Sequence, residues 1–185
     1  HGSHVSGIIA AVADNAIGVS GVAPQARILP IRVLDSFGSG DSKDVSKAVR
    51  FAVDSGVKVI NLSLGGATES TSLTAAIQYA VDRNVLVVAA AGNGAADSTP
   101  KWPAASDLAL AVTAVDRTNG VTSFDQRGEY IDLAAPGSSI LSTASNDYKI
   151  QSGTSMAAAF VTGAAALLFA AQPSITAAQV RDVLQ

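Results

Sequence analysis

The chain contains no cysteine, and this absence excludes disulfide bonds, a thiol nucleophile and a cysteine-ligated zinc site. It leaves the cellular compartment open. Aromatic residues make up only 5% of the sequence, and the formal net charge is −3. Because this charge offers no basic patch, binding to nucleic acid has no electrostatic support.

Long hydrophobic runs are also scarce. The longest nearly apolar stretch, residues 156–171, is shorter than the roughly 20 residues of a membrane-spanning helix. It contains Thr162 and Gly163 and lacks flanking positive charge. We therefore expect a buried core helix there and no membrane partner. The chain has 185 residues, 48% of them hydrophobic, which is enough for one core in a single domain over residues 1–185.

The hydrophobic pattern alternates between helical and strand periods along the whole sequence. Helices are predicted at 1–13, 42–55, 73–81, 156–171 and from about 177 to 185, and strands at 27–34, 57–62, 85–91 and 108–115. Unbroken apolar strands such as 85–91 are typical of parallel sheets buried on both faces. The sequence thus predicts an α/β fold of three layers, with helices on both faces of a mostly parallel sheet.

Segments rich in glycine, serine and asparagine follow three of the predicted strands. They are Gly38-Ser39-Gly40, Ser63-Leu64-Gly65-Gly66 and Gly92-Asn93-Gly94. Ligands of open α/β sheets bind beyond the carboxyl ends of the strands. We therefore expect these three loops to border one cleft.

The candidates for nucleophilic chemistry lie at opposite ends of the chain. The only histidines are His1 and His4, and a glycine-flanked serine, Ser155, precedes the apolar stretch at 156–171. The α/β-hydrolase order requires a histidine after the serine, and none follows Ser155. The chymotrypsin type is all-β, which conflicts with the alternating pattern. The order Asp, His, Ser of subtilisin remains.

Six blocks of the sequence resemble the subtilisin-like serine proteases (subtilases), in the order of that family. They are His1–Gly7 (HGSHVSG), Gly21–Pro24 (GVAP), Val57–Gly66 (VKVINLSLGG), Ala90–Asn93 (AAGN), Leu133–Gly137 (LAAPG) and Gly153–Ala157 (GTSMA). The resemblance covers nearly the whole chain. It implies a serine endopeptidase that is secreted and cleaves polypeptides bound in an extended conformation.

The resemblance also implies a role for each matching residue. Ser155 would be the nucleophile, His1 the general base, and Asn93 an oxyanion donor together with the backbone N–H of Ser155. Gly38, Ser39 and Gly40 on one side, and Ser63, Leu64 and Gly65 on the other, would bind the substrate as an added strand.

Other interpretations of these residues compete with the protease. His1 and His4 could form half of a metal site, but no acidic or cysteine partner accompanies them. Asn93 as a turn residue between glycines remains an alternative. A dinucleotide loop at 92–96 lacks its third glycine and a suitably spaced acidic residue. His4 is interpreted as a structural residue of a helix.

The aspartate of the triad has no counterpart where the family places it, before the histidine in a D-[ST]-G motif. Asp54-Ser55-Gly56 has that sequence, but it lies after His1 and ends a predicted helix. We expect this chain to be an internal fragment of a catalytic domain, without its N-terminal strands and C-terminal end. The missing N-terminal segment or another chain would supply the acid, and that segment or a propeptide is an expected partner. A catalytically inactive module is the alternative.

Two further features are expectations from the same resemblance. The loop 12–19 resembles a calcium loop, in which the carbonyls of Val12, Ile17 and Val19 and the side chain of Asn15 would bind structural Ca²⁺. A polar turn is the competing interpretation. Asp97 lies near the position where the family builds its S1 pocket, although a solvated loop is favoured there.

Overall fold

The computed structural model of the protein describes residues 1–95 and 99–185. Its central sheet has four parallel strands in the order β1-β2-β3-β4. The strands are β1 (Val59–Leu62), β2 (Leu86–Ala90), β3 (Leu110–Val115) and β4 (Leu133–Pro136). Neighbouring strands pair in register at Ile60 and Val87, Val88 and Leu110, and Thr113 and Ala134.

Strand β2 shows why the sheet is covered on both faces. All five of its residues are buried. Val87 and Ala89 join the core on the side of helices α2 (Ser42–Asp54) and α3 (Thr71–Val81). Leu86, Val88 and Ala90 join the core on the opposite side. Because successive side chains of a strand point to opposite faces, an unbroken apolar strand must be sandwiched.

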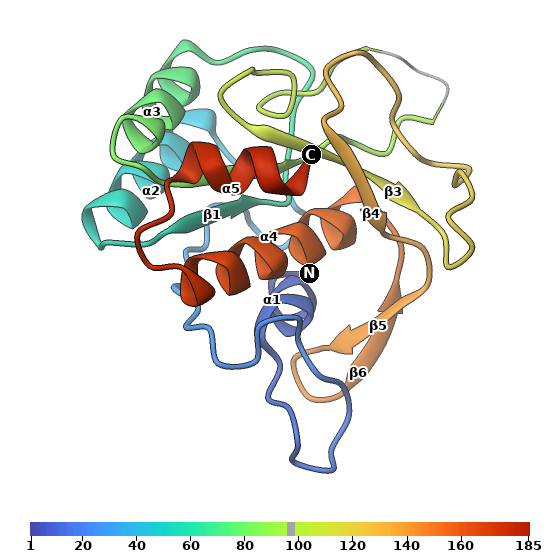
Figure 1. Ribbon diagram of the computed structural model, residues 1–185. Coiled ribbons are helices and arrows are strands. Elements are labelled where there is room, and N and C mark those ends of the chain that lie inside the picture. The colour runs from blue at the N-terminus through green and yellow to red at the C-terminus, as the bar shows by residue number, and fades with distance from the viewer. Residues whose placement is uncertain (96–98) are drawn as a thin grey trace.

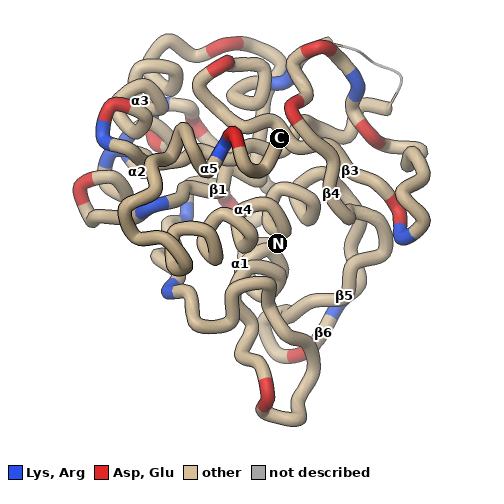
Figure 2. The backbone as a smooth tube through the Cα atoms, in the orientation of Figure 1, with Lys and Arg blue, Asp and Glu red and all other residues tan. Residues whose placement is uncertain are grey.

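Helices α4 (Thr154–Ala171) and α5 (Ala177–Leu184) cover that second face, in front of the sheet in Figure 1. No charged residue occurs in α4, which is tan throughout in Figure 2. Its length and composition are those of a potential membrane span, but half of it is buried in the fold. It contacts the sheet through small residues such as Ala157, Ala158 and Ala165, which allow close approach.

Helix α1 (Gly2–Ala10) packs against the first half of α4. Val5, Ile8 and Ile9 form a third apolar cluster with Met156 and Ala159. An antiparallel hairpin of β5 (Ile140–Thr143) and β6 (Tyr148–Gln151) lies beside α1 and leads directly into α4 (Figure 1). This hairpin therefore connects the helix that follows His1 with the helix that carries Ser155.

The predicted fold class is confirmed: the molecule is an α/β structure with a parallel sheet between two layers of helices. The predicted helices and strands are found within a few residues of their expected bounds, with one exception. The segment 27–34 was predicted as a strand, and this prediction was wrong.

Residues 27–34 have the β-branched composition of a strand but no partner for it. No backbone hydrogen bond joins this segment to another in the part of the chain that the structure describes. Ile28, Leu29 and Ile31 are 37–42% exposed. A strand exists only as part of a ladder, so composition alone does not create one.

Candidate active site

Ser155 lies in the first turn of α4, after a glycine that the backbone geometry requires. Gly153, the N-cap, has φ 154°, and a Cβ there would lie 3.3 Å from the Asn93 Nδ2. Ser155 is half-buried, and its Oγ lies 3.5 Å from the Ser63 carbonyl oxygen. A hydroxyl at the N-terminus of a helix lies in a positive potential that favours developing negative charge.

Asn93 follows β2 and is fixed by the residue that precedes Ser155. Its Oδ1 accepts hydrogen bonds from the backbone nitrogen of Thr154 at 2.9 Å and from the Thr154 hydroxyl at 3.1 Å. Because a backbone N–H can only donate, the oxygen of the carboxamide must face Thr154. The Nδ2 group is left with no acceptor among the described residues, and Asn93 is exposed. Its N–H groups are therefore available to a ligand.

Gln126 supports this loop, although no sequence motif marks it. The side chain is fully buried, its Oε1 accepts from the backbone nitrogen of Gly94 at 3.0 Å, and its Nε2 donates to the Thr99 carbonyl at 3.1 Å. One amide thus holds both ends of the loop that begins at Asn93. Sequence reasoning missed this residue, because only its burial and its distant partners reveal it.

His1 is the N-cap of α1, the helix that packs against α4, which carries Ser155. The packing of Val5 and Ile8 against Met156 holds α1 to the first turns of α4. The His1 ring is exposed and forms no hydrogen bond with any residue the structure describes. It can therefore approach a ligand without first breaking a bond within the protein.

His4 has a structural environment, as its position in a helix suggested. It is 1% exposed, and its Nε2 lies 2.8 Å from the Lys149 carbonyl and 3.1 Å from the Ile140 carbonyl. Carbonyl oxygens only accept, so Nε2 carries the proton. Nδ1 is buried without a partner in the described part. The ring fastens α1 to both strands of the β5–β6 hairpin.

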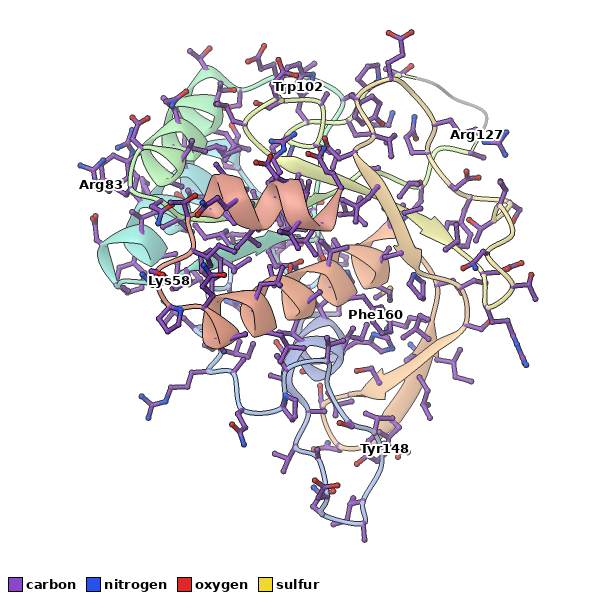
Figure 3. All side chains as sticks on the ribbon, in the orientation of Figure 1. Lys58, Arg83, Trp102, Arg127, Tyr148 and Phe160 are labelled. Atoms are coloured by element: carbon purple, nitrogen blue, oxygen red, sulfur yellow. The ribbon has the colours of Figure 1, made fainter. Side chains whose placement is uncertain are left out.

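The two segments predicted to bind the substrate are held in place by different hydrogen bonds. Gly66, which follows Ser63–Gly65, forms a two-bond antiparallel bridge with Trp102, labelled in Figure 3. Gly38–Gly40 belongs to a turn closed by Asp35, whose carboxylate accepts from the Ser39 nitrogen at 3.0 Å. No hydrogen bond links the two segments to each other in the described structure. Within the turn, the Ser39 nitrogen and carbonyl are both already bonded to Asp35.

Comparisons with known proteins identify the family of the chain. The profile described as "Subtilase family" matches residues 1–185. The chain belongs to the subtilase family. It is 44% identical over 186 residues to Thermitase of Thermoactinomyces vulgaris, which covers 100% of this chain and 66% of that protein. It is 43% identical over 186 residues to the Cell wall-associated protease of Bacillus subtilis (strain 168), covering 100% of this chain and 21% of that protein.

Solved structures confirm the fold of this subtilase. The S41 Psychrophilic Protease superposes with a TM-score of 0.91 at 37% identity, covering 98% of this chain and 67% of that one. Sphericase gives 0.90 at 37% identity with the same coverage. This subtilase chain spans two thirds or less of the length of the curated relatives above.

Asp54 lies away from the other candidate residues of this subtilase. It ends α2, whose C-terminus leads into the amino end of β1, whereas Ser63 and Asn93 follow the carboxyl ends of β1 and β2. Its carboxylate accepts a 2.7 Å hydrogen bond from the Tyr79 hydroxyl, and this bond raises the pKa of Tyr79. The geometry agrees with a helix end, not with a triad acid.

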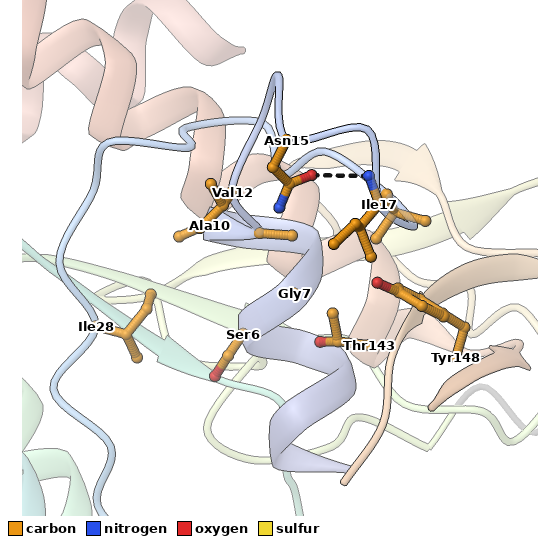
Figure 4. A pocket seen from close by; sticks show the side chains of 11 residues that line it. Ser6, Gly7, Ala10, Val12, Asn15, Ile17, Ile28, Thr143 and Tyr148 are labelled. Carbon is orange, nitrogen blue, oxygen red and sulfur yellow. Dashed lines mark hydrogen bonds between the residues drawn. The ribbon is translucent and has the colours of Figure 1, made fainter. Parts of the chain in front are cut away.

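The loop 12–19 of the subtilase borders a cavity of about 380 Å³, shown in Figure 4. Val12, Asn15, Ile17 and Val19 all line it. The Asn15 Oδ1 accepts from the Ile17 nitrogen at 3.0 Å, as an Asx turn does. Among the residues described, no three histidine or acidic side chains gather where a metal ion could be held. Asp97 lies outside the described residues.

Proposed function

We propose that this protein is a serine endopeptidase that hydrolyses peptide bonds through an acyl-enzyme. The Ser155 Oγ attacks the scissile carbonyl while the His1 imidazole takes its proton and passes it to the leaving amine. The His1 imidazole then takes a proton from water as the water attacks the ester, and gives that proton to the Ser155 Oγ as the new carboxylic acid leaves. The observation that carries the proposal is the pair of bonds from Thr154 that orients Asn93 beside Ser155.

Asn93 and the backbone N–H of Ser155 would stabilise the negative oxygen that forms during each attack. Such donors must be oriented before the reaction, because turning them during it costs free energy. The Asn93 oxygen is already occupied by Thr154, so its Nδ2 has one orientation. That fixed orientation supports the role of Asn93 as an oxyanion donor.

The proposed reaction also needs a carboxylate to hold the His1 imidazole in its correct tautomer. No carboxylate in the described part of the chain is hydrogen-bonded to the His1 ring. We propose that a segment preceding His1 in the whole protein, or another chain, supplies it. The source of this carboxylate is a prediction.

The proposed substrate is a polypeptide in extended conformation, added as a strand between Gly38–Gly40 and Ser63–Gly65. Backbone hydrogen bonds would give affinity that is independent of side chains. Gly65 approaches the Trp102 carbonyl closely, since a Cβ there would lie 3.2 Å from that oxygen. Larger residues at this position would narrow the space for a substrate backbone. The name of one relative, Cell wall-associated protease, supports an extracellular location.

A fluorophosphonate probe tests the proposed chemistry directly, because it reacts only with an activated serine. We expect one label, located at Ser155 by peptide mass spectrometry, and none in Ser155→Ala. Asn93→Ala should label more slowly. A folded protein that takes up no label would contradict the proposal and favour an inactive subtilase-fold module.

We further propose that the loop 12–19 holds a structural Ca²⁺ through the carbonyls of Val12, Ile17 and Val19 and the Asn15 side chain. All four residues line the same cavity, which supports this set. Calcium titration should raise the melting temperature, and Asn15→Ala should abolish the increase, while magnesium serves as the control. An identical response of the variant would exclude Asn15 as a ligand.

A further inference from the structure

A continuous line of hydrogen bonds runs from the middle of α4 through the end of β1 and back to the first turn of α4. The Thr162 hydroxyl donates to the Asn61 Oδ1 at 2.9 Å. The Asn61 Nδ2 donates to the Ser63 Oγ at 2.9 Å. The Ser63 hydroxyl donates to the Ser155 carbonyl at 2.9 Å.

The direction of every bond in this line follows from its last acceptor. The Ser155 carbonyl can only accept, so the Ser63 hydroxyl uses its single proton there. Ser63 must then accept from the Asn61 Nδ2, and the Asn61 oxygen must face Thr162. Thr162 is only 5% exposed, which leaves its hydroxyl little access to water as an alternative partner. The line therefore has one consistent arrangement, in which each donor depends on the next.

The line fastens α4 to β1 at two separate points. Ser155 and Thr162 are seven residues apart, about two helical turns or roughly 10 Å along the axis. Asn61 and Ser63 are two residues apart, about 7 Å along the strand direction. Two fixed points prevent both sliding and rotation of the helix, whereas one would prevent neither fully.

The apolar contact of α4 with the sheet begins with small residues near Ser155. Ala157 and Ala158 are small, and the larger Val161 and Phe169 follow further along the helix. Apolar burial is also non-directional. Hydrogen bonds supply the directional constraint: Thr154 and Asn93 fix the start of α4 to the loop after β2, and the bonds of Asn61 and Thr162 fix its position along β1.

We propose that Asn61 and Thr162 are positioning residues that keep Ser155 in register with the substrate segment Ser63–Gly65. This inference rests on the proposed protease function. It assigns a purpose to two side chains that touch no reacting atom. The same residue, Ser63, carries both the bond to Ser155 and the start of the strand that would hold the substrate. A displacement of about 1 Å between reacting groups can cost on the order of 100-fold in rate.

The test compares two variants of Thr162 with similar shapes. Thr162→Val keeps the branched side chain but removes the hydroxyl, and Thr162→Ser keeps the hydroxyl. We expect Thr162→Val to lower kcat, or the first-order labelling rate by a fluorophosphonate, by about 10-fold or more at nearly unchanged KM. Thr162→Ser should retain the rate within about 3-fold. Rates are expressed per folded molecule, so that lost stability does not imitate lost positioning.

A second measurement does not depend on activity. Hydrogen–deuterium exchange in the first turn of α4, residues 156–159, should become about 10-fold faster in Thr162→Val and stay unchanged in Thr162→Ser. Exchange in residues 163–170 should remain unchanged in both. If the wild-type protein fails to react but exchange responds in this way, the protease proposal fails and the positioning role stands.

The positioning role is overturned if Thr162→Val keeps both the wild-type rate and the wild-type exchange in residues 156–159. It is also overturned if Thr162→Val and Thr162→Ser lose rate equally, because the hydroxyl is then irrelevant. Asn61→Ala gives an independent check. Since Asn61 and Thr162 act in one line, their double variant should lose no more rate than the worse single variant.

Discussion

The Oδ1 of Asn93 accepts both polar hydrogens of Thr154, so the donor side of this carboxamide is oriented by the residue next to Ser155. Asn93 in turn provides a hydrogen-bond acceptor for Thr154. Thr154 is the first residue of α4 and is 1% exposed, so its backbone N–H would otherwise be an unsatisfied group at a helix N-terminus. Asn93 therefore caps the helix that carries the nucleophile.

Asn93→Leu should lower kcat by about 10²–10³-fold while leaving KM nearly unchanged, because an oxyanion donor acts on the transition state. This magnitude is the one known for the oxyanion donor of subtilisin, a member of the same family. Steady-state kinetics on a peptide substrate measure it. Asn93→Asp is the matched control: it retains the oxygen facing Thr154 but lacks the amide donor, and should be equally impaired. A fully active Asn93→Asp would exclude the role.

Gly137→Ala should destabilise the protein and slow labelling of Ser155. A Cβ at Gly137 would lie 2.5 Å from the Cβ of Ala114 and 2.8 Å from the Gly153 carbonyl oxygen. The Gly153 nitrogen also donates to the Gly137 carbonyl at 2.8 Å. Relief of the overlap must therefore shift the turn that precedes Ser155, at a cost of about 1–3 kcal/mol. Chemical denaturation measures the loss.

The control for this overlap is Gly2→Ala. No atom lies within 4 Å of a Cβ at Gly2, so the free energy of unfolding should be unchanged or slightly higher. Equal stability of Gly137→Ala and the wild-type protein would show that the backbone near Ala114 adjusts without strain.

Peroxide should inactivate the protein through Met156, its only methionine. Met156 is 2% exposed and packs against Val5 and Ile8, so a polar sulfoxide would disrupt the contact that holds α1 to α4. Labelling of Ser155 after peroxide treatment measures the effect. Met156→Leu, of similar volume, should resist peroxide and cost less than about 1.5 kcal/mol. Unaltered labelling of protein with fully oxidised Met156 would refute this account.

Asp116 should make stability depend on pH in the acid range. Hydrogen bonds from the Thr118 hydroxyl first, then from the Gly120 and Thr118 backbone nitrogens, hold the pKa of Asp116 below its usual value of 3.8. Stability from this group is therefore present above that value and is lost as the pH falls through the lowered pKa.

Asp116→Asn should accordingly lower the melting temperature near neutral pH, and the difference should shrink as the pH falls below 3.8 and through the lowered pKa. Glu129→Gln, whose side chain makes no hydrogen bond within the described residues, is the control and should show no such trend. A deficit of Asp116→Asn that persists unchanged at acid pH would assign the effect to the turn itself and not to ionisation.

The sequence predicted those elements whose own residues determine them. Helix α2 begins at Ser42 as predicted, because Val45 and Val49 recur at helical spacing and Asp41 caps the first turn by accepting from the Lys43 nitrogen. The strands β2 and β3 were likewise predicted from their own apolar residues. Elements that depend on a distant partner were not predictable from local pattern.

The β5–β6 hairpin is an example of such an element. Strand β6 alternates apolar and polar residues (YKIQ), but it is only four residues long and largely exposed, so the pattern is too short to predict a strand. Its pairing with β5 and the hydrogen bond from His4 of α1 to the Lys149 carbonyl hold it as a strand. The same reasoning applies to the site: Ser155, His1 and Asn93 were found through motifs, whereas Gln126 and Thr162 have no motif. Their importance arises from contacts with residues far away in sequence, which a single sequence does not reveal.

The attachment of α1 to the hairpin has a consequence for the order of folding. His4 contacts Ile140 and Lys149 across sequence separations of 136 and 145 residues, and the Thr143 hydroxyl donates to the Ser3 carbonyl across 140. Closing such long loops is slow, because the entropy cost precedes the contacts that offset it. During synthesis, α1 must wait undocked until residues 140–149 have left the ribosome. The proposed general base is therefore made well before the segments that fix its helix, and it is among the last residues to reach its place.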